Sequence, residues 1–128
     1  MKIELDSFPD GKYRIDSYKK GLISINGIKY SSSLIITPAQ LIPDWPPQRF
    51  TDLATQHIEQ ITALAPEIII IGTGNKICFL PPELVSLIGN LNIGVEVMDT
   101  GAACRCYNLL VSEGRNIAAG LLMIADCE

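Results

Sequence analysis

One stretch of the sequence concentrates the side chains that could do chemistry. Between Glu96 and Arg115 an apolar strand runs into a helix, and polar residues gather at both helix ends. Arg105 brings a forked donor, and Asn108 offers both a donor and an acceptor. Together with Glu113, such residues can hold a carboxylate, a phosphate or the backbone of a partner protein. The pattern is typical of a binding site, but it names no reaction.

The helix expected from Ala102 to Glu113 has one polar face. Arg105, Asn108 and Ser112 recur there at positions i, i+3 and i+7. The simpler interpretation is an ordinary solvated surface, which most amphipathic helices have. The alternative is a binding face, and the pattern leaves both interpretations open.

Both ends of this helix are expected to hold nearby side chains in place. Asp99 or Thr100 can cap the first turn by accepting a bond from an unpaired amide. Gly114 is expected to end the helix in the left-handed conformation, which would hold Glu113 and Arg115 in a stiff turn. If Asp99 lies beside Arg115, a structural salt bridge that positions the strand and the helix is an alternative to a binding site, and proximity alone does not separate the two interpretations.

A second candidate site follows an apolar run from Glu67 to Gly72. Such a run is typical of a strand buried on both faces of an α/β sheet, so helices are expected on either side. In the turn formed by Gly72, Thr73 and Gly74, exposed amides could take an anion. The dinucleotide-binding pattern needs glycine where Ile77 stands, so a tight structural turn is the favoured interpretation.

Two single residues are further candidates. Trp45 lies among prolines in a loop expected from Ile42 to Pro47. Tryptophan is enriched at interface hot spots, so Trp45 is either an exposed anchor for a partner or a clamp of this loop on its own core. His57 is the only histidine, and because no serine or cysteine is identifiable as its partner, a structural or surface role is favoured.

The four cysteines fit neither a zinc pattern of paired C-x-x-C motifs nor a short secreted disulfide framework. They are Cys78, Cys104, Cys106 and Cys127. Residues two apart on a helix point away from each other, so Cys104 and Cys106 are not expected to act as a pair. We expect buried free thiols in a reducing compartment, no bound metal, no cofactor and no need for a disulfide.

Composition restricts the class of protein. The 128 residues, 48% of them hydrophobic, predict one domain over residues 1–128. A net charge of -4 without a basic run makes nucleic acid an unexpected partner. The charged start from Met1 to Asp6 lacks the apolar core of a secretory signal. The longest aliphatic block, Ile68 to Ile71, is too short to insert into a membrane, so a soluble cytoplasmic protein is expected.

Hydrophobic periodicity and turn residues predict the elements that position these residues. Asn26-Gly27 indicates a hairpin, because both residues accept positive φ. Strands are expected over Tyr13–Ser17, Leu22–Ile25, Ile28–Tyr30, Ser33–Ile36, Glu67–Gly72, Ile93–Met98 and Ile117–Ile124, and two more helices over Asp52–Leu64 and Pro82–Leu87.

Three segments, in this order, resemble one known family: Gly72 to Gly74, Glu96 to Thr100, and Cys104-x-x-Tyr-Asn followed by Glu-Gly-Arg115. The family comprises small α/β domains. It includes a mitochondrial assembly factor of respiratory complex I (NADH dehydrogenase), the adipogenesis-associated domain protein, and uncharacterised bacterial and archaeal relatives. The resemblance covers roughly residues 13–122, and one departure is Cys106, where threonine is usual.

The resemblance implies a compact three-layer α/β domain with a mixed central sheet, an N-terminal β-hairpin region and flanking helices. For the mitochondrial branch it implies a non-catalytic assembly role through protein partners, which does not by itself transfer complex I assembly to this chain. Because the sequence lacks catalytic motifs, the favoured function is a non-catalytic module that binds an unidentified protein partner and assists the assembly or stability of a membrane-associated or respiratory complex. The alternative is a small-molecule-binding protein or an undescribed enzyme. Its polar cleft would lie near Gly72, Thr73 and Gly74 and be lined by Asp99, Arg105, Asn108, Glu113 and Arg115.

Overall fold

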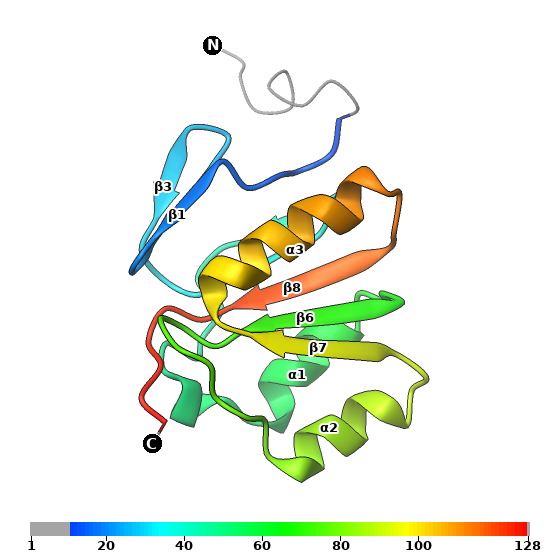
Figure 1. Cartoon of the computed structure of the whole chain (residues 1–128). Coiled ribbons are helices and arrows are strands. Elements are labelled where there is room, and N and C mark those ends of the chain that lie inside the picture. Colours follow the sequence, from blue (N-terminus) through cyan, green and yellow to red (C-terminus); the bar gives the residue numbers. More distant parts are fainter. Residues whose placement is uncertain (1–10, 128) are drawn as a thin grey trace.

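The computed structural model describes residues 11–127, which form three layers around a five-stranded sheet (Figure 1). The strand order is β5-β4-β8-β6-β7. Strand β6 is parallel to β7 and β8, whereas β4 is antiparallel to β5 and β8. The expectation of a mixed central sheet is therefore confirmed. The strands are β4 (Leu34–Ile36), β5 (Leu41–Ile42), β6 (Ile68–Gly72), β7 (Gly94–Met98) and β8 (Ile117–Leu121).

Helices cover both faces of this sheet, as the apolar run of β6 predicts. Helix α3 (Thr100–Ser112) covers one face, and α1 (Thr55–Thr62) and α2 (Pro82–Gly89) cover the other (Figure 1). Successive strand residues point to opposite faces, so Ile70 packs with the α3 side and Ile71 with the α1 and α2 side.

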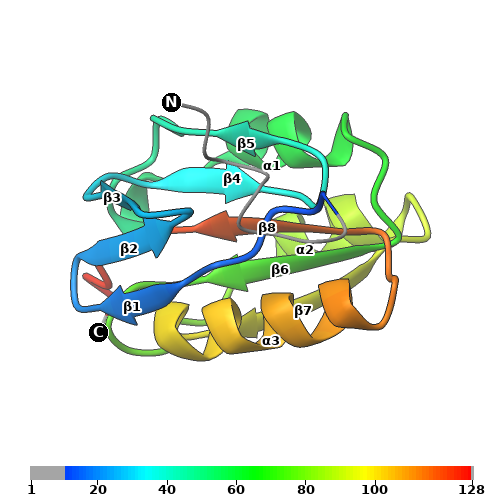
Figure 2. The same ribbon diagram turned by 90° about the horizontal axis from the view of Figure 1, so that it is seen from above.

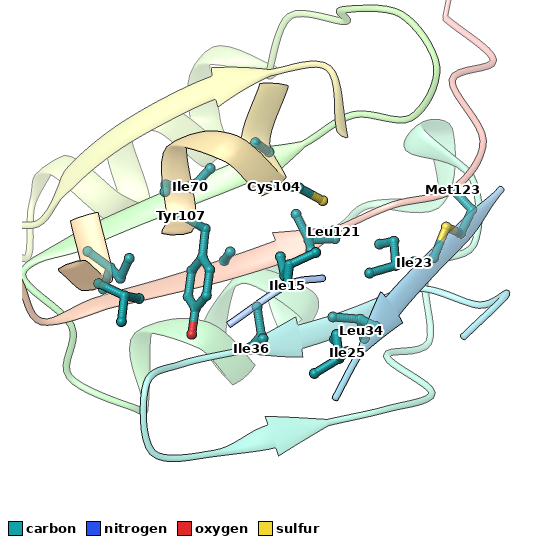
Figure 3. Packing of buried hydrophobic residues seen from close by; sticks show 14 residues of the cluster. Ile15, Ile23, Ile25, Leu34, Ile36, Ile70, Cys104, Tyr107, Leu121 and Met123 are labelled. Carbon is teal, nitrogen blue, oxygen red and sulfur yellow. The ribbon is translucent and has the colours of Figure 1, made fainter. Parts of the chain in front are cut away.

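A three-stranded antiparallel sheet lies beside α3 on the same face of the central sheet (Figure 2). It consists of β1 (Ser17–Lys19), β2 (Leu22–Ile25) and β3 (Ile28–Tyr30). Asn26 and Gly27 have φ values of 54° and 80°, which confirms the predicted hairpin turn. Figure 3 shows Ile23 and Ile25 of β2 in the same core cluster as Tyr107 and Cys104 of α3.

The element boundaries differ from the expected ones where distant contacts intervene. The strand expected over Tyr13–Ser17 begins only at Ser17, because side chains of α3 bind the backbone of the residues before it. The helix expected from Asp52 begins at Thr55, after a short 3-10 helix, η2 (Phe50–Asp52). Strand β8 ends at Leu121 and does not reach Ile124.

Candidate functional site

The eight residues of the predicted cleft are distributed along the whole of α3. Gly72, Thr73, Gly74 and Asp99 lie at its N-terminal end, Arg105 and Asn108 lie along it, and Glu113 and Arg115 follow its last turn. A helix of 13 residues is about 20 Å long. The structure therefore does not bring these eight residues into one cleft.

The turn after β6 is a buried polar junction. The amide of Thr73 donates to the Met98 carbonyl at 2.9 Å, and the amide of Gly74 donates to Thr100 Oγ1 at 2.8 Å. The Thr100 hydroxyl in turn donates to the Leu122 carbonyl at 2.6 Å. Because the amides of Thr73 and Gly74 are already bonded, the favoured interpretation as a structural turn is the one that the structure supports. We call Gly72, Thr73, Gly74, Asp99 and Thr100 the polar junction.

The glycines of the polar junction allow the chain to approach itself. A Cβ on Gly74 would lie 2.5 Å from the Ala125 nitrogen, and φ at Gly74 is 107°. A Cβ on Gly72 would lie 2.8 Å from Thr100 Oγ1. Only glycine fits such contacts, so these two positions are explained by packing within the fold.

Asp99 and Arg115 have different partners. Asp99 is the N-cap of α3, and its Oδ1 accepts from the Ala102 amide at 2.9 Å. Arg115 Nε donates to Glu67 Oε1 at 2.8 Å, and this bond holds the pKa of the Glu67 carboxyl below its usual value. Gly114 has φ of 77° and ends the helix as expected. The side chain of Arg115 is 43% exposed, so this ion pair lies at the surface.

Asn108 binds the chain itself. Its Oδ1 accepts from the Ile15 amide at 2.8 Å, and its Nδ2 donates to the Ile15 carbonyl at 2.7 Å. The neighbouring Tyr107 hydroxyl donates to the Tyr13 carbonyl at 2.9 Å, and burial raises the pKa of Tyr107. These two side chains therefore fasten the segment before β1 to α3.

Two predicted site residues, Arg105 and Asn108, line one pocket, and the side chain of Arg105 is exposed. The pocket has a volume of about 260 Å³ and lies between α3 and the start of β1, where Tyr18 and Cys104 also line it. Burial raises the pKa of Cys104 to about 12, so its thiol stays protonated and is a poor nucleophile at neutral pH. Arg115 borders a different pocket of about 320 Å³, together with Lys12 and Gln40.

Trp45 and His57 are both structural. The side chain of Trp45 is fully buried, and a Cβ on Gly120 would lie 2.7 Å from its ring. The interpretation of Trp45 as an exposed anchor is therefore wrong, and the loop is clamped onto the core as in the alternative. His57 Nδ1 accepts from the Ala54 amide at 3.0 Å at the start of α1, which confirms its structural role.

The cysteines correct one expectation and confirm another. Cys78 and Cys127 form a disulfide, with 5.9 Å between their Cα atoms and a sequence separation of 49. The expectation of free thiols is wrong for this pair, because the tail after β8 returns to the segment that follows β6. Cys104 and Cys106 are free and form no pair, as expected. Within residues 11–127 no three His, Cys, Asp or Glu side chains are grouped to hold a metal ion.

Some exposed apolar side chains in the structure were not among the site residues predicted from the sequence. Within residues 11–127, four of the seven exposed large apolar residues lie in the linker after β6, in α2 and just beyond it. We call the segment Ile77–Leu91 together with β7 the edge surface, since α2 packs beside β7 and β7 ends the sheet. On α2, Leu84 and Ile88 form the buried stripe, and Val85 lies outside it. The helical spacing in the sequence could therefore have indicated that Val85 is exposed. The four residues are Ile77, Phe79, Val85 and Leu91.

The fold defines the class of protein, which is a three-layer α/β domain. In it the polar side chains of Asp99, Thr100 and Asn108 bind the backbone of the chain itself. The chain belongs to the family of proteins of unknown function DUF498/DUF598, whose pattern it matches over residues 15–122. A crystal structure of a protein from Bordetella parapertussis is similar, with a TM-score of 0.83 and 35% identity. That match covers 88% of this chain and 96% of the Bordetella chain.

Several relatives have descriptive names. One is a 13 kDa major membrane protein of Francisella tularensis subsp. holarctica, 35% identical, with 79% of this chain and 83% of the relative covered. Another is NADH dehydrogenase [ubiquinone] 1 alpha subcomplex assembly factor 3 of Mus musculus, 33% identical over 90% of this chain. This chain spans 62% of the mouse protein. Within residues 11–127 no helix has the length and apolar character needed to cross a membrane.

Proposed function

We propose that this protein is a non-catalytic protein-binding module that assists the assembly or stability of a partner complex. The observation that carries the proposal is the edge surface. Phe79 is 83% exposed there, and Ile77, Val85 and Leu91 are exposed in the same segment. Exposed apolar residues scattered singly are ordinary, whereas four in the segment that carries α2, the helix that contacts strand β7, favour a protein interaction site.

The fate of the polar candidates supports the same proposal. Asp99, Asn108 and Thr100 direct their hydrogen bonds to the backbone of this chain. Relatives named as NADH dehydrogenase [ubiquinone] 1 alpha subcomplex assembly factors favour a role in assembly, and a respiratory or membrane-associated complex is the partner that we propose on this ground. The net charge of -4 favours a protein partner over nucleic acid.

A pair of matched variants tests the edge surface. Ile77 and Ile28 are both 47% exposed, but Ile28 lies in β3, on the other side of the central sheet. Ile77→Ser is expected to weaken capture of a partner from native extract at near-physiological salt. Ile28→Ser is expected to leave capture unchanged. Both variants should keep the melting temperature of the parent, because exposed substitutions have small effects on stability.

Two results would contradict this proposal. One is the repeated recovery of no specific partner by the unaltered protein. The other is an equal loss of capture in Ile77→Ser and Ile28→Ser. A cytoplasmic location accompanies the proposal and is tested by cell fractionation. Thiol labelling of the fresh fraction would show whether Cys78 and Cys127 are bonded there.

A further inference from the structure

Strand β7 has a partner strand on one side only. It ends the order β5-β4-β8-β6-β7, and its residues pair with β6. In the part of the chain that the structure describes, no strand lies along its outer side, which Figure 1 shows at the edge of the sheet. A sheet edge of this kind presents unpaired backbone groups to another strand.

Two hydrogen bonds define which backbone groups of β7 face outward. The Gly94 amide donates to the Glu67 carbonyl at 3.0 Å, and the Met98 carbonyl accepts from the Thr73 amide at 2.9 Å. In a parallel pair, every second residue bonds to the same neighbour. Gly94, Glu96 and Met98 therefore bond toward β6. The amide and carbonyl groups of Val95 and Val97 point away from it.

The charged side chains around this edge are all acidic. From Ile77 to Cys104 the sequence contains no lysine and no arginine, but it contains Glu83, Glu96 and Asp99. Glu96 is exposed at the middle of β7. A cross-strand neighbour of opposite charge is favourable, so the edge fits a strand that carries a lysine or arginine.

The same charge disfavours a second copy of this chain. An antiparallel pairing of two copies that uses the outward groups of Val95 and Val97 places Glu96 opposite Glu96 of the other copy. Like charges directly opposite each other are destabilising, and each chain carries a net charge of -4. The edge is therefore better suited to a different chain.

We propose that an extended segment of a partner protein adds to β7 as a sixth strand. Its backbone bonds to Val95 and Val97, and a basic side chain lies beside Glu96. Apolar side chains of the added strand pack along α2 and Val85. This inference rests on the proposed protein-binding function, and it identifies the partner by an extended, basic and apolar segment.

A designed peptide tests the inference on the full chain. The probe is an eight-residue peptide of alternating threonine and valine with one central lysine, blocked at both ends. Nuclear magnetic resonance titration of the labelled protein is expected to shift the amide signals of Val95 and Val97. Replacing the peptide lysine with glutamate should weaken binding about fivefold at low salt, which corresponds to about 1 kcal/mol.

Two controls separate strand addition from adhesion to an apolar surface. A peptide methylated on the amides that face β7 should not bind, because it lacks donors. Val97→Pro removes an outward amide and leaves the bonds to β6, so it should also abolish binding. If this variant does not fold, the methylated peptide still decides the question. Equal binding of the methylated and unmethylated peptides would overturn the proposal.

Two other outcomes would contradict strand addition without contradicting the proposed function. If the lysine peptide leaves β7 unchanged, and Val97→Pro still captures the partner that Ile77→Ser loses, the module binds proteins through apolar side chains alone. If sedimentation shows a dimer whose Val95 and Val97 amides are protected from exchange, a second copy occupies the edge. Loss of all partner capture by the unaltered protein would instead contradict the proposed function.

Discussion

The polar junction and the edge surface lie close together on the same sheet and use opposite chemistry. In the polar junction, Thr73 and Thr100 are fully buried and bonded to backbone groups. On the edge surface, Phe79 is 83% exposed, and β7 has an open side. The comparison teaches that chemical type alone is a poor guide to a binding residue. Whether the group is exposed and without a bond inside the fold is the better guide. Asp99, Asn108 and Thr100 are occupied by bonds within the fold, although Arg105 is exposed, and apolar residues of the edge surface are exposed as well.

The largest expected effect tests whether the polar junction is structural. Thr100→Val removes a hydroxyl that bonds the Gly74 amide and the Leu122 carbonyl. Each buried group left without a partner costs about 1–3 kcal/mol, so the free energy of unfolding should fall by about 2–6 kcal/mol. Chemical denaturation measures this loss. Thr100→Ser keeps the hydroxyl and should lose less than half as much, whereas equal losses would point to packing as the cause.

The next effect concerns the tail that packs against the polar junction. Cys127→Ser removes the bond to Cys78, which closes a loop with a sequence separation of 49. Without reductant, the free energy of unfolding should fall by about 2–4 kcal/mol, because the unfolded chain gains freedom. Cys106→Ser is the matched control at a free thiol. If excess dithiothreitol does not reduce the difference between Cys127→Ser and the parent, the disulfide is not its source.

A smaller loss is expected where α3 holds the N-terminal segment. Asn108→Ala deletes both hydrogen bonds to the Ile15 backbone and should cost about 1–3 kcal/mol of stability. Hydrogen exchange at the Ile15 amide should become faster, and capture of a partner should be unchanged. If the variant kept its stability but lost capture of the partner, Asn108 would be a binding residue and not a structural one.

The smallest effect is expected at the surface ion pair. Arg115→Ala should change the melting temperature little at neutral pH, because Glu67 and Arg115 are both well exposed. Since Arg115 lowers the pKa of Glu67, the stabilisation is present above the usual glutamate value of 4.5 and is lost as pH falls through the lowered pKa. The parent and the variant should therefore become equally stable in acid. A large loss at neutral pH would contradict this prediction.

Much of the fold was predictable because local chemistry defines its elements. Asn26 and Gly27 accept positive φ, so the hairpin between β2 and β3 needs no distant contact. The isoleucines of β6 predict a strand covered on both faces, and Asp99 caps α3 from three residues away. The sequence suggested a single cleft, which the structure does not form. Which side chains meet was not predictable, because the spacing between elements does not reveal it.

The sequence by itself determined most of the strands and helices, the caps of α3 and the hairpin turn, because these depend on bonds between residues close in the chain. It did not predict β5, which begins before the expected loop and includes Ile42. Only the tertiary structure decided the partners of distant groups. Asn108 meets Ile15 across 93 residues, Arg115 meets Glu67 across 48, and Cys78 meets Cys127 across 49. Packing of the layers selects such pairs, and it also decided that Trp45 is buried and that no strand of residues 11–127 pairs with the outer side of β7.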